Sequence, residues 1–343
     1  MTHYAGLDVS QKETSICIVD EQGRRLWRGT APTDPEALAQ ILCRHGSDLQ
    51  VGIETGPLMP WLVHELRRRG LEVICLDARH AKAALAMQLN KTDRNDAEGL
   101  AQIVRTGWYR SVHVKSFEAH RLRALLGARR QLVGMTTQLS NHIRGILKVF
   151  GLVVGPAHGR TFSERVETLV ADQPAVAGIV RPMVQVWRAL KEQIARFDKA
   201  VRQEVRQRAE CRLLMSVPGI GALSVLAYVS AIEHPERFRQ SRNVGAHLGL
   251  TPRRYQSGEV DRSGRISKCG DELVRSYLFE AAGVLLTRVQ RWSPLKAWAV
   301  RLVQRSGFNK ARVALARKLA VILHTIWRTG EPFRWTNLEA AAA

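Results

Sequence analysis

The apolar residues of this chain follow one pattern up to about residue 115 and a different pattern after it. Before that point, short apolar runs alternate with turn residues, which predicts strands and short helices. From Glu118 to Phe150 the apolar residues instead recur at steps of three and four, with arginines on the other side. That spacing predicts one long amphipathic helix of the coiled-coil kind. The apolar positions are Leu122, Leu125, Leu132, Leu139, Ile143 and Ile146. The chain must therefore combine an α/β region with a helical one.

The first region begins with three strand-like runs, the second and third joined by the turn Glu21-Gln22-Gly23. Three strands joined by short turns predict an antiparallel meander. Helix and strand patterns then alternate, which predicts an α/β layer with a mixed sheet. The expected strands are 4–9, 14–19, 24–30, 49–54 and 72–76, and the expected helices are 35–44, 61–69, 79–89 and 94–106.

The rest of the chain is predicted to be mainly helical. Residues 151–175 are interrupted by Gly and Pro and predict a loop or small insert. A second helix over 176–214 could return antiparallel to the first, and such a pair would serve dimerisation. A compact helical region is expected from Leu214 onward. With 343 residues there is room for several cores, so we expect domains at 1–112, 113–212 and 213–343.

The charge of the chain points to a polyanionic partner. Its 52 Lys and Arg against 31 Asp and Glu give a formal net charge of +21, and nucleic acid is the common polyanion. Between Glu280 and Glu331 there is no acidic residue, so the helices there should present a surface to a polyanion. The basic residues of this stretch are Arg288, Arg291, Lys296, Arg301, Arg305, Lys310, Arg312, Arg317, Lys318 and Arg328.

Other classes of protein are disfavoured. No apolar run approaches the ~20 residues of a membrane-spanning helix, and the N-terminus has no signal-peptide pattern. The five cysteines are scattered, with no C-x-x-C pair, which argues against disulfides and structural zinc. Cys17 and Cys75 lie in strand-like runs and are expected to be core thiols. These features favour a cytoplasmic, nucleoid-associated protein without a membrane partner.

Four carboxylates occupy positions where α/β folds build sites. Asp8 ends the first strand, Glu54 ends the fourth, and Asp93 and Asp96 open a helix on one face. Clustered carboxylates suit Mg²⁺, with Mn²⁺ as an alternative, and such an ion can assist phosphodiester chemistry. Three positions also have an ordinary explanation, since Asp8 could cap a turn, and Asp93 and Asp96 could be an N-cap and a first-turn acid favoured by the helix dipole. For Glu54 that explanation is weak, because an unpaired carboxylate at the end of an apolar strand is costly.

The C-terminal region contains the turn Ser216-Val217-Pro218-Gly219-Ile220-Gly221 between two apolar helical stretches. It resembles a helix–hairpin–helix turn, in which the amides of Gly219 and Gly221 could hold a phosphate. An ordinary turn between helices explains the same pattern equally well.

Further along, Ser257 lies in the tripeptide Q-S-G, and four arginines flank it. A serine is a poor nucleophile unless it is activated, and arginines can hold a phosphate beside it. A serine beside glycine is more often a simple turn residue, so composition alone leaves both interpretations open. The flanking residues are Arg253, Arg254, Arg262 and Arg265.

The segments GLDVSQKE, GIETG and KTDRNDAEGLA resemble the N-terminal domain of the Piv/MooV invertases and the IS110 insertion-sequence transposases. That domain belongs to the RuvC branch of the RNase H-like fold, and the resemblance implies four metal ligands at Asp8, Glu54, Asp93 and Asp96. The segment LGLTPRRYQSGEVDRSGRISKCGDELVRSYL resembles the transposase domain of the same family.

The second resemblance implies that a serine is the DNA nucleophile. Ser257 is the best matching position, Ser267 is the runner-up and Ser263 is third, while Lys268 and Arg275 would contact phosphate. The family implies a site-specific recombinase that moves an insertion sequence through a serine–DNA link. It further implies a dimer that forms a tetramer when active, and a structured guide RNA.

Three other functions fit parts of the pattern. A RuvC-like junction resolvase or nuclease shares the carboxylates and cuts DNA with water. A sugar kinase or actin-like ATPase begins with a similar strand, but its second phosphate loop is not found. A non-catalytic nucleic-acid-binding scaffold would explain the charge and would tolerate loss of the carboxylates.

Overall fold

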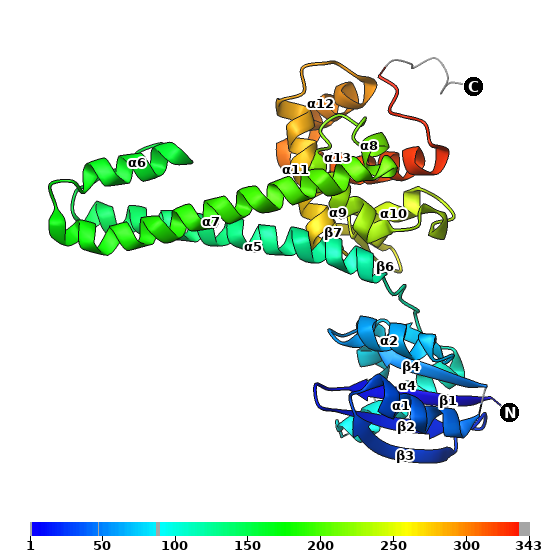
Figure 1. The fold of residues 1–343 in the computed structure, drawn as a ribbon. Coiled ribbons are helices and arrows are strands. Elements are labelled where there is room, and N and C mark those ends of the chain that lie inside the picture. Colours follow the sequence, from blue (N-terminus) through cyan, green and yellow to red (C-terminus); the bar gives the residue numbers. More distant parts are fainter. Residues whose placement is uncertain (1, 47, 87–89, 336–343) are drawn as a thin grey trace. The chain divides into compact units, whose positions relative to one another are not determined.

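The computed structural model describes residues 2–46, 48–86 and 90–335, and the chain forms two compact units, residues 1–117 and 118–343 (Figure 1). The first unit ends near the expected boundary at residue 112. Whether the second unit separates further at residue 212 stays a prediction.

The first unit contains a five-stranded mixed sheet with the order β3-β2-β1-β4-β5. The first three strands form the predicted antiparallel meander, whereas β4 pairs parallel with β1 and β5 pairs parallel with β4. The mixed sheet expected from the sequence is therefore confirmed. The strands are β1 (His3–Val9), β2 (Glu13–Val19), β3 (Arg25–Pro32), β4 (Leu49–Glu54) and β5 (Glu72–Leu76).

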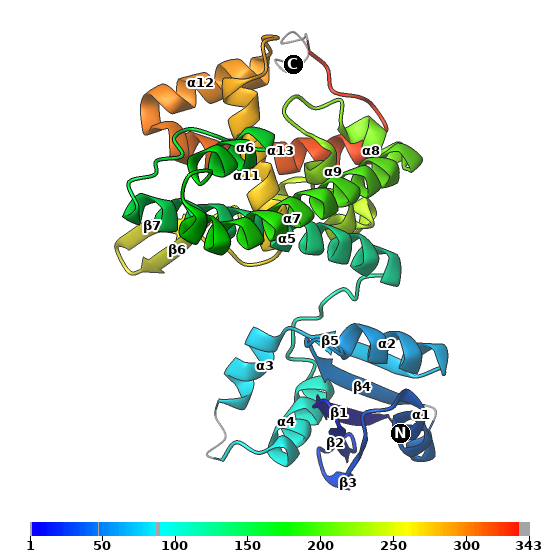
Figure 2. The same ribbon diagram turned by 60° about the vertical axis from the view of Figure 1, so that its left-hand side comes forward.

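Helices cover both faces of this sheet (Figure 2). On one face, α1 (Pro35–Leu42) and α2 (Met59–Arg68) pack on Ala5, Leu7 and Ile53, and η1 (Cys43–His45) follows α1. On the other face lie α3 (Ala78–Leu85) and α4 (Asp93–Thr106). The helix expected to extend to Leu89 ends at Leu85, and residues 87–89 lie outside the described residues.

The second unit contains two long helices, α5 (Phe117–Val149) and α7 (Pro174–Gln207), which run side by side (Figures 1 and 2). Leu122 of α5 shares a core with Val201 of α7, and an ion pair of 2.6 Å joins Arg129 to Asp198. Farther along α5, Ile143 meets residues near the start of α7. The predicted antiparallel return of the second helix is thus confirmed.

The stretch expected to be a loop or small insert contains a helix, α6 (Arg160–Leu169). Its buried residues Phe162 and Val166 pack against α7. The Gly and Pro residues on its N-terminal side and the Gln-Pro pair after it obscured this helix, which is only ten residues long. A helix so short depends on packing against its neighbours more than on its own propensity.

The remaining elements form a mainly helical body, as predicted, and Tyr228 at its centre donates a hydrogen bond of 2.8 Å to the carbonyl of Ala320. The β6–β7 hairpin within it is a difference from the prediction. Both hairpin faces are exposed and polar, so no apolar alternation marks it in the sequence. The elements are α8 (Ala209–Leu214), α9 (Ala222–Ile232), η2 (Pro235–Arg237), α10 (Arg242–His247), β6 (Pro252–Ser257), β7 (Val260–Ile266), α11 (Glu272–Thr287), α12 (Pro294–Ser306) and α13 (Phe308–Thr329).

Two further expectations concern hydropathy and cysteine. In the part of the chain that the structure describes, no helix combines the length and the apolarity that crossing a membrane requires. Cys17 and Cys75 are buried core thiols, as predicted, and burial raises the pKa of each to about 11.

Candidate functional site

Asp8 and Glu54 occupy equivalent positions at the carboxyl ends of two neighbouring parallel strands. Leu7 of β1 pairs with Ile53 of β4, so the two carboxylates follow at the same level of the sheet. Side chains alternate between the two faces of a strand, so Asp8 shares a face with Gly6, and Glu54 shares that face with Gly52. Both acidic side chains therefore leave the sheet on the face that carries α4.

The two glycines let α4 lie directly against the sheet. A Cβ at Gly6 would lie 2.1 Å from the carbonyl oxygen of Ala97, and one at Gly52 would lie 2.3 Å from a methyl group of Val104. Only a residue without a side chain permits an approach this close. The helix consequently crosses β1 and β4, with its N-terminal turn toward the strand ends that carry the acids.

The first turn of α4 contributes the other two carboxylates. The hydroxyl of Thr92 accepts a hydrogen bond of 3.2 Å from the amide of Asn95, which caps the helix and starts it at Asp93. Asp93 and Asp96 are three positions apart and project from one side of that turn. The partial positive charge of a helix N-terminus partly offsets their negative charge.

The pKa values show that these carboxylates form one electrostatic cluster. Burial raises the pKa of Asp8 above its ordinary value, and the charges of Asp93 and Asp96 raise it further. Burial likewise raises the pKa of Glu54, with added repulsion from Asp8 and Asp96. Like charges held together in this way favour either a proton or a cation among them.

The four acids suit a hard divalent cation that keeps part of its water shell, and they do not form a closed cage around an ion. Among the described residues, no three His, Cys, Asp or Glu side chains converge closely enough to enclose a metal ion. Mg²⁺ does not require such a cage, because it keeps several waters and binds through one or two carboxylates together with substrate phosphate. Four oxygen-donating acids at the carboxyl ends of β1 and β4 and in the first turn of α4 meet that requirement.

Lys91 is a feature of this site that the sequence analysis missed. Its positive charge offsets part of the rise in the pKa of both Asp8 and Glu54, so it lies within the electrostatic reach of the cluster. The available signal was its position two residues before Asp93. The supporting glycines had a signal as well, since Gly-x-Asp and Gly-x-Glu end two strands at the same spacing.

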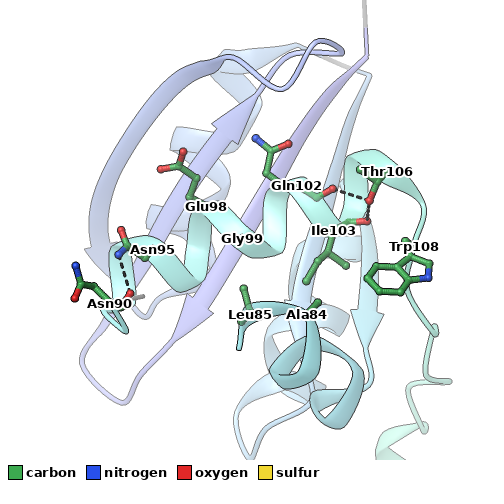
Figure 3. A pocket seen from close by; sticks show the side chains of 10 residues that line it. All are labelled: Ala84, Leu85, Asn90, Asn95, Glu98, Gly99, Gln102, Ile103, Thr106 and Trp108. Carbon is green, nitrogen blue, oxygen red and sulfur yellow. Dashed lines mark hydrogen bonds between the residues drawn. The ribbon is translucent and has the colours of Figure 1, made fainter. Parts of the chain in front are cut away.

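A separate cavity of about 710 Å³ lies beside α4, between that helix and α3 (Figure 3). Its lining includes Leu85, Gly99, Ile103 and Trp108. None of the four carboxylates is among the described residues that line it. The cavity is therefore a different feature of the unit from the carboxylate cluster.

In the second unit, Ser257 is the last residue of β6 and lies at the tip of the exposed hairpin. It pairs with Val260, and the turn between them contains Gly258 with a φ of 54°. Within the described residues, no hydrogen bond involves the Ser257 hydroxyl. The side chain is thus accessible to a large substrate, and no base among the described residues is hydrogen-bonded to it.

The four arginines predicted around Ser257 lie on the two hairpin strands. Arg254 forms a two-pronged ion pair with Asp261 across the hairpin, with distances of 2.6 and 2.9 Å. Arg253 donates a hydrogen bond of 3.3 Å to the carbonyl of Ser267. Arg262 and Arg265 are exposed. The hairpin therefore gathers the predicted serine and its cationic neighbours on one projecting ribbon.

Three other predicted residues lie at or next to the foot of the hairpin. The hydroxyl of Ser267 accepts a hydrogen bond of 3.4 Å from the amide of Cys269, and Lys268 is exposed with a φ of 54°. Arg275 donates to the carbonyls of Leu248 and Gly270 at 3.2 and 3.0 Å. Its guanidinium thereby joins the segments on either side of the hairpin. The third serine, Ser263, is exposed on β7.

The predicted phosphate turn lies between α8 and α9, apart from the hairpin. Gly219 has a φ of 85°, and a Cβ there would lie 2.6 Å from the carbonyl oxygen of Ala281, so close packing requires this glycine. Gly221 precedes α9 with open space around it. Both line a cavity of about 720 Å³ whose wall also includes Arg202 and two acids, Asp198 and Glu280, each of which forms an ion pair with an arginine.

Comparison with known proteins gives a consistent result along the chain. A profile described as "Transposase" matches residues 5–151, and one described as "Transposase IS116/IS110/IS902 family" matches residues 211–297. The transposase for insertion sequence element IS1111A of Coxiella burnetii is 29% identical over 96% of this chain and 90% of its own length. A probable family 20 transposase of Pseudomonas aeruginosa is 33% identical over 68% of this chain and 71% of its own length. A pilin gene-inverting protein of Moraxella bovis is 29% identical over 38% of this chain and 40% of its own length. The carboxylate site and the serine hairpin fall within the two matched segments, and the chain belongs to the IS116/IS110/IS902 family of transposases.

Proposed function

We propose that this transposase is a site-specific recombinase that cuts and rejoins DNA through a serine–DNA intermediate. In this proposal the first unit is a RuvC-like domain of the RNase H-like class, and its four carboxylates assist the reaction. The observation that carries the role of the acids is the placement of Asp8 and Glu54 on paired strand ends, facing the first turn of α4, and the exposed position of Ser257 among arginines supports the role of the serine.

Asp8, Glu54, Asp93 and Asp96 would hold the divalent ion, with Mg²⁺ preferred and Mn²⁺ able to replace it. When bound, such an ion supplies polarisation of the phosphoryl oxygens and lowers the proton affinity of an attacking oxygen. Lys91 would bring a positive charge to the phosphate from the protein side, because it already interacts with two of the acids.

The hydroxyl of Ser257 would attack the phosphorus of a DNA phosphodiester. The Oγ–P bond forms, the P–O bond to one of the two deoxyriboses breaks, and the serine proton ends on the departing hydroxyl. Rejoining is the reverse attack by a new DNA hydroxyl, which frees the serine. Arg253, Arg262 and Arg265 would stabilise the charge on the phosphate.

The proposed partners are donor and target DNA, a structured guide RNA and further copies of the chain. The positive charge of the chain supports nucleic-acid partners, because each phosphate contact with Lys or Arg releases a counterion. Exposed apolar side chains on the long helices support assembly into a dimer and then a tetramer. These side chains are Val133, Met135, Ile179 and Val186.

A second candidate is a metal-dependent nuclease or junction resolvase that cuts DNA with water. One observation favours it: the carboxylate cluster is complete within residues 1–117, while no hydrogen bond to the Ser257 hydroxyl is present among the described residues. The two candidates differ in whether protein becomes covalently attached to DNA.

The test incubates the full chain with Mg²⁺, DNA carrying the ends of its element, and RNA transcribed from the flanking non-coding region. Denaturing gels then separate free DNA from a covalent protein–DNA adduct. We expect an adduct with the wild type and none with Ser257→Ala, while Ser267→Ala retains it. Cleavage without an adduct that persists in Ser257→Ala would establish the nuclease instead.

A further inference from the structure

A groove of about 480 Å³ lies at the foot of the serine hairpin, where the hairpin meets α12 and α13. The hairpin side consists of Leu250, Pro252 and Ile266, at the start of β6 and the end of β7. Trp298 of α12 contributes an aromatic wall and is half-buried against the core. The α13 side consists of Lys310, Val313, Ala314, Arg317, Lys318 and Val321.

The α13 residues of the groove all belong to one side of that helix. Steps of three and four residues connect Lys310 to Ala314, Arg317 and Val321, which is the spacing of neighbours along a helix face. Val313, Ala314 and Val321 are only partly buried, although an apolar helix face normally packs against another element. This face therefore has room for a further group beside it.

The cations at the groove are available to an anion. Lys310, Arg317 and Lys318 are exposed, and none forms an ion pair with an acidic residue in the described parts of the chain. No acidic residue occurs between Glu280 and Glu331 to neutralise them. An apolar wall with one aromatic ring and three unpaired cations combines the two features by which proteins bind single-stranded nucleic acid.

We propose that this groove holds an unstacked nucleotide of a single DNA or RNA strand. Its base would lie against Trp298 and the apolar side of α13, with its phosphate on Lys310, Arg317 or Lys318. A base pair within a duplex is stacked on both faces and has no free face for such a wall, so a single strand is favoured. This inference rests on the proposed function for the presence of nucleic acid beside the hairpin.

The groove and Ser257 lie at opposite ends of the same strand. A six-residue strand spans roughly 17–20 Å, so the bound nucleotide would lie several nucleotides from a phosphate at Ser257. The groove would therefore hold the strand that flanks the cut, and it would not hold the scissile nucleotide. Holding that flank would fix the position of the strand along the hairpin before the serine reacts.

Photochemical cross-linking tests the location directly. The full chain is irradiated with a single-stranded oligonucleotide of about 12 nucleotides in which 5-iodouracil replaces thymine, and cross-linked peptides are identified by mass spectrometry. We expect cross-links to the peptide that contains Trp298. Trp292, which is 61% exposed and is not among the residues lining the groove, is the internal control. Cross-links at Trp292 without any at Trp298 would overturn the proposal.

Binding measurements on variants give an independent test. Ala314→Phe fills the groove, and the double change Lys310→Ala with Lys318→Ala removes two exposed cations without touching the core. Both are expected to weaken binding of the same fluorescein-labelled single strand by about tenfold, and binding of the matching duplex by less than about threefold. Arg305→Ala removes an exposed cation of α12 outside the groove. It should weaken binding of the single strand and of the duplex slightly and to the same extent.

The two proposals can fail separately. If no covalent adduct forms with wild type but the groove variants still lose single-strand affinity, the serine mechanism fails and the groove remains. If the adduct forms and the groove variants bind single strands like the wild type, the groove proposal is wrong. A folding defect in Ala314→Phe would show as a lower Tm, and the lysine double variant then decides.

Discussion

The two units of this transposase differ in charge far more than in size. Residues 1–117 contain 15 basic and 14 acidic residues, a net of +1, whereas residues 118–343 contain 37 and 17, a net of +20. The unit with the carboxylate cluster repels phosphate unless a cation is present. The net charge of the other unit favours contact with phosphate. The chain therefore places the acids that we propose to assist the chemistry and most of its excess positive charge in different units.

The prediction with the largest expected effect replaces one acid of the cluster. Asp93→Asn keeps the size of the side chain and removes its charge, so we expect DNA cleavage to fall on the order of 10³-fold or more. DNA affinity should stay within about twofold, because the affinity comes from the second unit. Cleavage gels and fluorescence anisotropy measure the two quantities.

The matched control for that change is Asp77→Asn, which alters an acid at the start of α3 that pairs with Arg79. It should leave cleavage close to wild type because asparagine also caps helices. A large loss of DNA affinity in Asp93→Asn would contradict the separation of chemistry from binding.

The units also differ in what their glycines do. Gly6→Ala would place a methyl group 2.1 Å from the backbone of α4, so we expect a loss of about 2–3 kcal/mol of stability and loss of cleavage as α4 moves. Gly134→Ala in α5 meets no atom within 4 Å and should instead add up to about 1 kcal/mol, since alanine favours helix. Urea unfolding measures whether the free energy of unfolding falls in Gly6→Ala and rises in Gly134→Ala.

These glycines show what the sequence could reveal of the first unit. The strand order and the four acids follow from local patterns, because each element has a clear apolar period and an acid at its end. The contact between Gly6 and α4 joins residues about ninety positions apart. No local pattern encodes such a contact. The resemblance to a family identified the four acids, but it did not explain how α4 comes to lie against the strands that carry two of them.

The second unit was harder to predict for a different reason. Its long helices have a strong apolar period, but the β6–β7 hairpin is exposed on both faces and has no apolar alternation. Its polar residues therefore resemble a loop. The engagement of Arg275 with the backbone carbonyls of Leu248 and Gly270 was equally hidden, because nothing near Arg275 in the sequence marks it as a structural cation.

A smaller effect concerns the stability of the carboxylate cluster. Because the pKa of Asp8 is raised in the folded protein, folding is favoured more when Asp8 is protonated, and this contribution is lost as pH rises through the raised pKa. At neutral pH without metal, Asp8→Asn should therefore raise Tm by roughly 2 °C. Adding Mg²⁺ should raise the Tm of the wild type more than that of Asp8→Asn. An equal response of the two proteins to Mg²⁺ would show that the ion binds elsewhere.

The prediction with the smallest expected effect asks whether an acid of the second unit keeps an arginine from contacting phosphate. Asp261→Asn frees Arg254 from its ion pair on an exposed hairpin, where such pairs contribute little to stability. We expect DNA affinity to rise about threefold and the salt dependence to steepen by about one unit, because one more arginine can contact phosphate. Glu259→Gln removes the same charge from the same hairpin without freeing an arginine, so it should change affinity less and leave the slope unaltered. If both variants behave alike, only the net charge of the hairpin matters, and Arg254 makes no phosphate contact of its own.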